Sequence, residues 1–175
     1  SGYQISSTSS VDDSIWVSIY GPQGNALTSS PTIHDISGDG IEDVIIGAGN
    51  RLYAYHGVNG TLIWFLDVGP FGESLSTPAI YPGTGSLKRI VVNSFLPGRR
   101  TLRTTVVNFE GYHLKNITSD LTSQLINYPF PSAGPIPYPV ISDVTGNGNP
   151  EILVTYPAIS NFGRVVLYSF SLDEI

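Results

Sequence analysis

The sequence predicts an all-β protein made of repeated units of short antiparallel strands, and three observations support this. Runs rich in Val, Ile, Tyr and Thr are bounded by Gly, Pro, Asn and Asp, as is typical of short strands between turns. An Asn-Gly pair and a Glu-Gly pair separate some of these runs, as in β-hairpins. A Pro-containing approach followed by a loop and an apolar run occurs three times, beginning near residues 30, 77 and 138. Such repetition indicates a repeat architecture.

Residues 1–29 precede the first repeat and hold one segment with strand-like alternation, Ser14–Tyr20. This segment would either close the array by pairing with the last repeat or pair with a neighbouring subunit of a fibre, and the sequence does not choose between the two. Residues 30–175 hold the repeats. The one helical pattern, Ser119–Ile126, has an N-cap-like start and predicts two turns of helix.

Each repeat is expected to contain about four short antiparallel strands, which is the composition of a propeller blade. In the first repeat, strands Arg51–His56 and Thr61–Leu66 flank the turn Val58–Gly60. Similar runs follow the other two loops, at Leu102–Leu114 and Arg164–Phe170. Three copies are one short of the smallest usual ring, so the chain would be a piece of a larger propeller or would close its edges in another way.

The loop of the first repeat carries oxygen-bearing groups at alternate positions. Its expected cation ligands are Asp35, Ser37, Asp39, the carbonyl of Ile41, and Asp43. A hard cation such as Ca²⁺ takes six to eight oxygens, and glycines between the ligands allow a short loop to turn its side chains inward. The flanking runs are β-like, whereas an EF-hand has helices there and a glutamate at its twelfth position. An Asx/Gly-rich turn without metal is the alternative.

The third repeat carries a similar loop with fewer charges. Its corresponding ligands are Asp143, Thr145, Asn147, Asn149 and Glu151. The second repeat has lost the site, since the ligand positions hold Pro82, Thr84 and Ser86, with Lys88 and Arg89 close by. We therefore expect Ca²⁺ at the first loop, a weaker site at the third, and none at the second.

The Asp-x-Ser-Gly-Asp-Gly-x-x-Asp loop, with Pro-x-Ile before it and Val-Ile-Ile-Gly after it, resembles the FG-GAP (VCBS-type) repeats of integrin-like β-propellers. The resemblance covers residues 30 to about 170. It implies a β-propeller with a calcium ion at Asp35–Asp43 and a second one at Asp143–Glu151. The third repeat departs from the family pattern at Thr145, Asn147 and Glu151, which lowers the charge of that loop.

Composition argues against several classes of function. The net charge is −6, whereas nucleic-acid binding needs a basic face. No apolar run approaches membrane-spanning length. The chain has no Cys and no Gly-x-Ser-x-Gly elbow, and its three histidines (His34, His56 and His113) have no acid partner evident in sequence. We therefore expect no enzyme and no catalytic residue.

The expected function is a calcium-binding module of the cell surface or extracellular space, where Ca²⁺ is abundant enough to fill weak sites. Calcium would be structural, and exposed loops would bind a protein or a glycan. The alternatives are a subunit of an extracellular filament or sheath assembled by strand exchange, and a non-catalytic module of a secreted polysaccharide-active enzyme. Sequons at Asn59 and Asn116 leave glycosylation open.

Overall fold

The structure is a computed structural model that describes residues 29–70, 74–83, 88–96, 101–120, 136–159 and 162–169. These residues form strands and connections without any helix, so the all-β prediction is confirmed for them. The expected strand Ser14–Tyr20 lies outside the described residues. No helix in the described part is long and apolar enough to cross a membrane.

Sheet A is a four-stranded antiparallel meander in the order β1-β2-β3-β4. Its strands are β1 (Thr32–His34), β2 (Asp43–Ala48), β3 (Arg51–Tyr55) and β4 (Leu62–Asp67). Strands β3 and β4 are joined by the expected Asn-Gly turn, in which Gly60 has a φ of 68°. A left-handed conformation of this kind favours glycine because it has no Cβ.

Sheet B has strand order β5-β7-β8-β9, and β6 also pairs with β7. Its strands are β5 (Ser74–Leu75), β6 (Ala79–Tyr81), β7 (Arg89–Leu96), β8 (Thr101–Val107) and β9 (His113–Asp120). All pairings are antiparallel.

The helix expected to begin at Ser119 is wrong at its start, because Ser119 and Asp120 pair with Leu102 and Thr101 in strand β9. The hydrogen bonds of the β8–β9 hairpin outweigh the local N-cap pattern there. The rest of the expected helix lies outside the described residues.

Sheet C has three antiparallel strands in the order β10-β11-β12 among the described residues. They are β10 (Val140–Ser142), β11 (Glu151–Ile159) and β12 (Phe162–Ser169).

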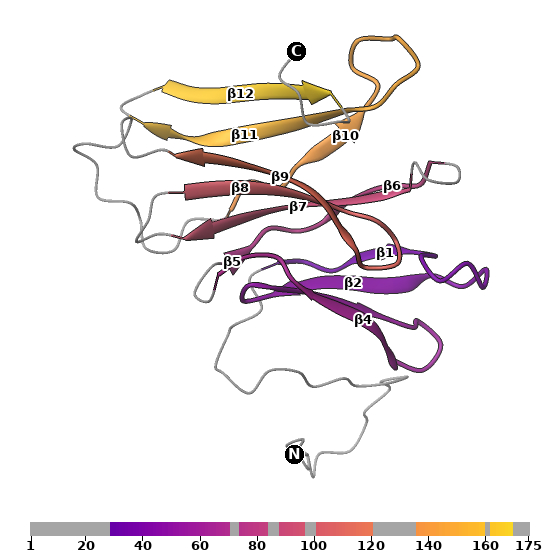
Figure 1. Cartoon of the computed structure of the whole chain (residues 1–175). Coiled ribbons are helices and arrows are strands. Elements are labelled where there is room, and N and C mark those ends of the chain that lie inside the picture. The colour runs from indigo at the N-terminus through magenta and orange to yellow at the C-terminus, as the bar shows by residue number, and fades with distance from the viewer. Residues whose placement is uncertain are drawn as a thin grey trace, which may run out of the picture.

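The three sheets are stacked in chain order, with sheet B between sheets A and C (Figure 1). Between A and B, Ile45, Leu52 and Ala54 pack against Ile90, Val92 and Val107. Between B and C, the cluster consists of Val91, Leu102, Val106, Ile152, Val154, Val166 and Tyr168. Both faces of β7 and β8 are thus covered by apolar side chains, so these two strands are buried on two sides.

The first strand of each repeat lies next to its counterpart, because β1 contacts β6 and β6 contacts β10. Thr32 Oγ1 donates to the carbonyl of Pro78 at 2.7 Å, and the Ser30 N–H donates to Thr77 Oγ1 at 3.1 Å. The β1–β2 and β10–β11 loops consequently emerge at the same end of the stack (Figure 1).

Candidate metal site

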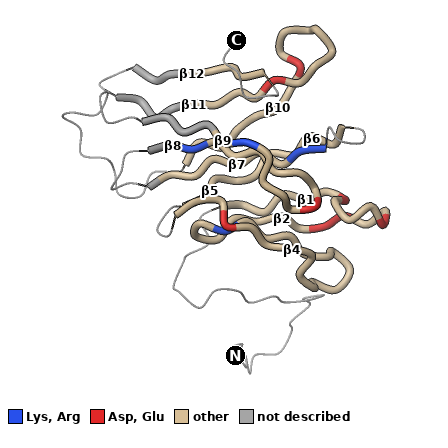
Figure 2. The backbone as a smooth tube through the Cα atoms, viewed as in Figure 1, with Lys and Arg blue, Asp and Glu red and all other residues tan. Residues whose placement is uncertain are grey.

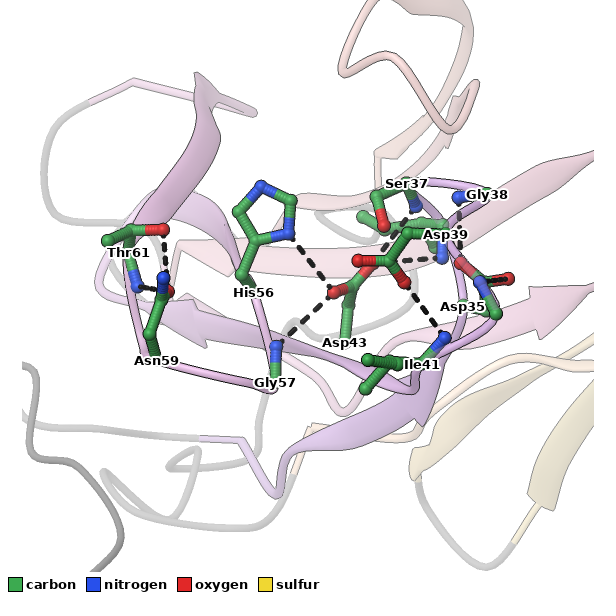
Figure 3. Close-up of polar contacts among 12 residues, drawn as sticks. Asp35, Ser37, Gly38, Asp39, Ile41, Asp43, His56, Gly57, Asn59 and Thr61 are labelled. Atoms are coloured by element: carbon green, nitrogen blue, oxygen red, sulfur yellow. Dashed lines mark hydrogen bonds and ion pairs between the residues drawn. The ribbon is translucent and has the colours of Figure 1, made fainter.

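The first candidate loop joins β1 to β2 and turns through two glycines. Gly38 and Gly40 have φ angles of 82° and 85°, in the left-handed region. A Cβ at either position would meet no atom within 4 Å, so the preference for glycine there comes from the backbone angle and not from crowding. These turns bring the carboxylates of Asp35 and Asp39 back over the loop (Figure 3).

Asp35 holds the loop through both of its carboxylate oxygens. The Gly38 N–H donates to Oδ1 at 2.7 Å, and the Gly40 N–H donates to Oδ2 at 3.0 Å. Desolvation pushes the pKa of Asp35 upward, but hydrogen bonds from Gly38, Gly40 and Asp39 and the charge of Lys88 outweigh it. The pKa of Asp35 therefore lies below its usual value, and the group is an anion at neutral pH.

Asp39 makes a similar local bond, with its Oδ1 accepting from the Ile41 N–H at 2.8 Å. Asp39 and Ser37 are exposed to solvent, as is Glu42. The expectation that Glu42 takes no part in a shell of ligands stays a prediction.

Asp43 differs from the other carboxylates because it is fully buried. Its Oδ2 accepts from the N–H groups of Ile36 and Ser37, at 3.2 and 2.9 Å. Its Oδ1 accepts from the Gly57 N–H at 3.3 Å and lies 3.6 Å from His56 Nδ1 (Figure 3). Asp43 thus fastens the start of the loop to the β3–β4 turn.

The loop between β10 and β11 repeats this bonding pattern. Asp143 accepts from the N–H groups of Asn147 and Gly148, and Asn147 Oδ1 accepts from the Asn149 N–H. Gly146 and Gly148 have φ angles of 72° and 84°, matching the two glycines of the first loop.

Glu151 takes the place of Asp43 and is only 2% exposed. Its Oε2 accepts from the N–H groups of Val144 and Thr145, at 2.8 and 3.2 Å. Its Oε1 accepts from Thr145 Oγ1 at 2.9 Å and from Asn147 Nδ2 at 3.4 Å. In both loops, although they are far apart in sequence, a buried carboxylate at the last position therefore accepts from two successive backbone N–H groups near the start of the loop.

The second repeat has a cation where the other two have a buried carboxylate. His34 pairs with Asp43 and Ser142 pairs with Glu151, and the corresponding pair in sheet B is Tyr81 with Arg89. An arginine side chain has no acceptor atom, so it cannot take the N–H bonds that Asp43 and Glu151 take. Lys88 Nζ lies 5.4 Å from the centre of the Phe109 ring. Thr84 and Ser86 lie outside the described residues.

The donor chemistry of the first loop fits a hard divalent cation. Every candidate ligand offers oxygen, and acidic residues gather at the β1–β2 loop (Figure 2). Carboxylate oxygens that accept one N–H bond keep a lone pair for a metal. The residues that would hold Ca²⁺ are Asp35, Ser37, Asp39, the Ile41 carbonyl and Asp43.

In the arrangement described, no group of three or more His, Asp or Glu side chains stands ready to hold a metal ion within the ranges that the structure covers. The composition of the first loop explains the absence of such a group. The carboxylates of Asp35 and Asp39 bond to backbone N–H groups of the loop. Two further candidate ligands, the Ser37 hydroxyl and the Ile41 carbonyl, are not acidic side chains.

The structure gives His56 an acidic partner that its sequence neighbourhood does not reveal. The histidine was expected to lack an acid nearby, but its Nδ1 faces the buried Asp43. His34 packs edge-on against Phe109 with ring centres 5.6 Å apart, and His113 Nε2 lies 2.6 Å from Asn116 Oδ1. Sequence separation hides the first pair, because Asp43 and His56 come together only after β3 has folded back beside β2.

No model of a known protein family and no curated protein matches the chain. Among solved structures, it is similar to the V. cholerae biofilm matrix protein Bap1, with 17% sequence identity and a TM-score of 0.47. The similarity covers 91% of this chain and 32% of the Bap1 chain, so the chain spans about a third of that protein.

Proposed function

We propose that the chain is a calcium-binding module of the FG-GAP type, with propeller-like sheets, that works outside the cell and binds a protein or glycan. The observation that carries the proposal is the shared design of the two loops. In each, left-handed glycines and N–H bonds arrange oxygen donors around a turn that bears carboxylates.

The stack of sheets supports the propeller part of the proposal. The first strands β1, β6 and β10 lie side by side, and the sheets extend from them in sequence order. This is how blades of a propeller are arranged around its central channel. The extracellular setting follows from the metal, because exposed loops of modest charge bind Ca²⁺ weakly and fill only where it is abundant.

Calcium would be structural in this proposal. The candidate ligands belong to one short loop and fasten it to itself and, through Asp43, to the β3–β4 turn. The exposed hairpin tips at Val58 and Tyr112 would then be available for a partner, with no catalytic role for the histidines.

Calorimetry with two variants tests the ligand assignment. Asp39→Ala removes a proposed ligand and should abolish calcium binding at the first loop. Glu42→Ala removes a charge of the same sign from a side chain outside the proposed shell, and should leave affinity nearly unchanged. Equal affinities for the two variants would show that the proposed ligand set is wrong.

The two loops should also differ in affinity. Residues 35–43 contain four carboxylates, whereas residues 143–151 contain two, and charge count is a main determinant of calcium affinity. Titration of the unsubstituted chain should therefore show a tighter and a weaker event. Asp39→Ala should remove the tighter event alone, and loss of the weaker event instead would reverse the assignment.

Strand exchange between copies is a second candidate function, and one observation favours it. Sheet C has three strands among the described residues, whereas sheet A has four, so β12 has no described partner strand on its outer side. An added strand from another copy would extend sheet C at β12. Deletion of residues 1–20 should abolish such assembly if Ser14–Tyr20 is the donated strand, and filaments formed by the truncated chain would exclude this role.

A further inference from the structure

The second repeat has no carboxylate at its own loop, but it carries a lysine close to the first loop. Asp43 and Arg89 hold the same register position, opposite the last residue of the first strand of their repeats. Lys88 precedes Arg89 as Glu42 precedes Asp43, so a cation stands in sheet B where sheet A has an anion. Because β1 contacts β6, the end of β1 and the start of β7 lie at the same end of neighbouring sheets (Figure 1).

The ring of Phe109 holds the Lys88 ammonium in place. This ring belongs to the apolar cluster between sheets A and B and is 4% exposed. Lys88 Nζ lies 5.4 Å from the ring centre, which is within the range of a cation–π contact. The His34 ring packs edge-on against the same ring, with centres 5.6 Å apart. Because Asp35 follows His34, one buried ring keeps the ammonium close to the first residue of the loop.

The charge of Lys88 acts on the loop from this position. Desolvation raises the pKa of Asp35, whereas backbone N–H bonds within the loop and the charge of Lys88 lower it. The ammonium thus stabilises the carboxylate when no metal is bound. Residues 35–43 contain four carboxylates, so the attraction from Lys88 opposes their mutual repulsion in the empty loop.

We propose that Lys88 sets the calcium affinity of the first loop, acting from the neighbouring repeat; this inference rests on the calcium function proposed for that loop. With no ion bound, the ammonium offsets part of the negative charge of the loop and favours the empty state. A bound Ca²⁺ carries two positive charges and is repelled by the ammonium, so the same side chain disfavours the bound state. Lys88 therefore makes the first site weaker than its own ligands alone would make it.

Calorimetric titration of the full chain with calcium chloride tests the proposal through Lys88→Met. This substitution keeps a long side chain over the Phe109 ring and removes the charge. The affinity of the tighter event should rise about threefold to tenfold, because interactions between exposed charges are modest and the ion carries two charges. The weaker event, at residues 143–151, is the internal reference. It should keep its affinity, since Phe109 holds Lys88 on the side of sheet B that faces sheet A.

Two control variants separate the position of the charge from its mere presence. Lys88→Arg keeps a cation over Phe109 and should bind calcium with nearly unchanged affinity. Arg51→Met removes a positive charge from the far end of β3, which spans Arg51–Tyr55 and reaches the loop end of sheet A at Tyr55. At about 3.3 Å per residue, Arg51 lies about 13 Å along the strand from that end, beyond the Debye length of about 8 Å at physiological salt. Arg51→Met should therefore leave both events unchanged.

Melting in excess chelator gives a readout that needs no metal. Lys88→Met should melt at a lower temperature than the unsubstituted chain in chelator, because the empty loop loses the charge that offsets its repulsion. In excess calcium the two chains should melt closer together, since the ion replaces the lost positive charge. A higher salt concentration should reduce the difference seen in chelator, because it screens exposed charges.

Three results would overturn the role of Lys88: a tighter event whose affinity stays the same or falls in Lys88→Met, an equal rise in affinity at both events, or an unchanged melting temperature in chelator. Each of these leaves the proposed calcium function intact, because the unsubstituted loop still binds the ion. A chain that binds no calcium in any variant would instead remove the proposed function, and this inference with it.

Discussion

Chelation of calcium is expected to lower the melting temperature of the chain by about 5–10 °C. A ligand that binds only the folded state stabilises it by about 2.7 kcal/mol when present at a hundred times its dissociation constant. For a domain of this size, each kcal/mol corresponds to about 2–4 °C. Repulsion among Asp35, Asp39, Glu42 and Asp43 adds to the loss once the ion is removed, because these charges lie within nine residues. Calorimetric melting in excess calcium and in excess chelator measures the difference.

The double variant Asp35→Asn/Asp39→Asn is the control for this experiment. It removes two proposed ligands and two of the repelling charges, so its melting temperature should depend much less on calcium. Its melting temperature in chelator should lie close to that of the unsubstituted chain. Relief of the repulsion offsets the loss of one of the two N–H bonds, from Gly38 and Gly40, that Asp35 accepts on its two oxygens. An unsubstituted chain that melts at the same temperature with and without chelator would make the loop an ordinary acidic turn and would remove the main support for an extracellular setting.

The sequence was sufficient for the parts of the fold that are determined locally. Alternating runs of β-branched residues predicted the strands. The pairs Asn59-Gly60 and Glu110-Gly111 predicted the β3–β4 and β8–β9 hairpins. Both predictions were possible because turn chemistry and strand propensity act over a few residues. The loop at Asp35–Asp43 was recognisable because its glycines and its alternating oxygen donors are adjacent in sequence. The ligand roles themselves stay predictions.

What the sequence did not show depends on pairing between distant segments. Asp43 stays a predicted ligand, but its burial and its bond to Gly57 were not evident, because Gly57 reaches it only after β3 has folded against β2. The helix expected from Ser119 was wrong at its start, because Ser119 and Asp120 pair with β8 in a way that their local sequence does not reveal. The stacking of sheet B between two others likewise follows from non-local burial.

Asp43→Ala is expected to destabilise the fold by about 2–4 kcal/mol even in the absence of calcium. The substitution leaves the N–H groups of Ile36, Ser37 and Gly57 without the carboxylate that accepts from them, and Ile36 is buried. A buried donor left without a partner costs about 1–3 kcal/mol, and water reaches only part of this loop. Urea denaturation in chelator measures the loss without any contribution from bound metal.

Asp39→Ala is the matched comparison, because it removes a carboxylate from the same loop at an exposed position. Asp39 accepts one bond, from the Ile41 N–H, and solvent can replace it. We expect a loss below about 1 kcal/mol in chelator, although this variant should lose calcium binding. Amide exchange at Ile36 and Ser37 should accelerate in Asp43→Ala and stay slow in Asp39→Ala, since only Asp43 holds those two N–H groups. Equal losses of stability in chelator, with equal exchange at both amides, would mean that Asp43 does not fasten the loop and that its burial has no structural role.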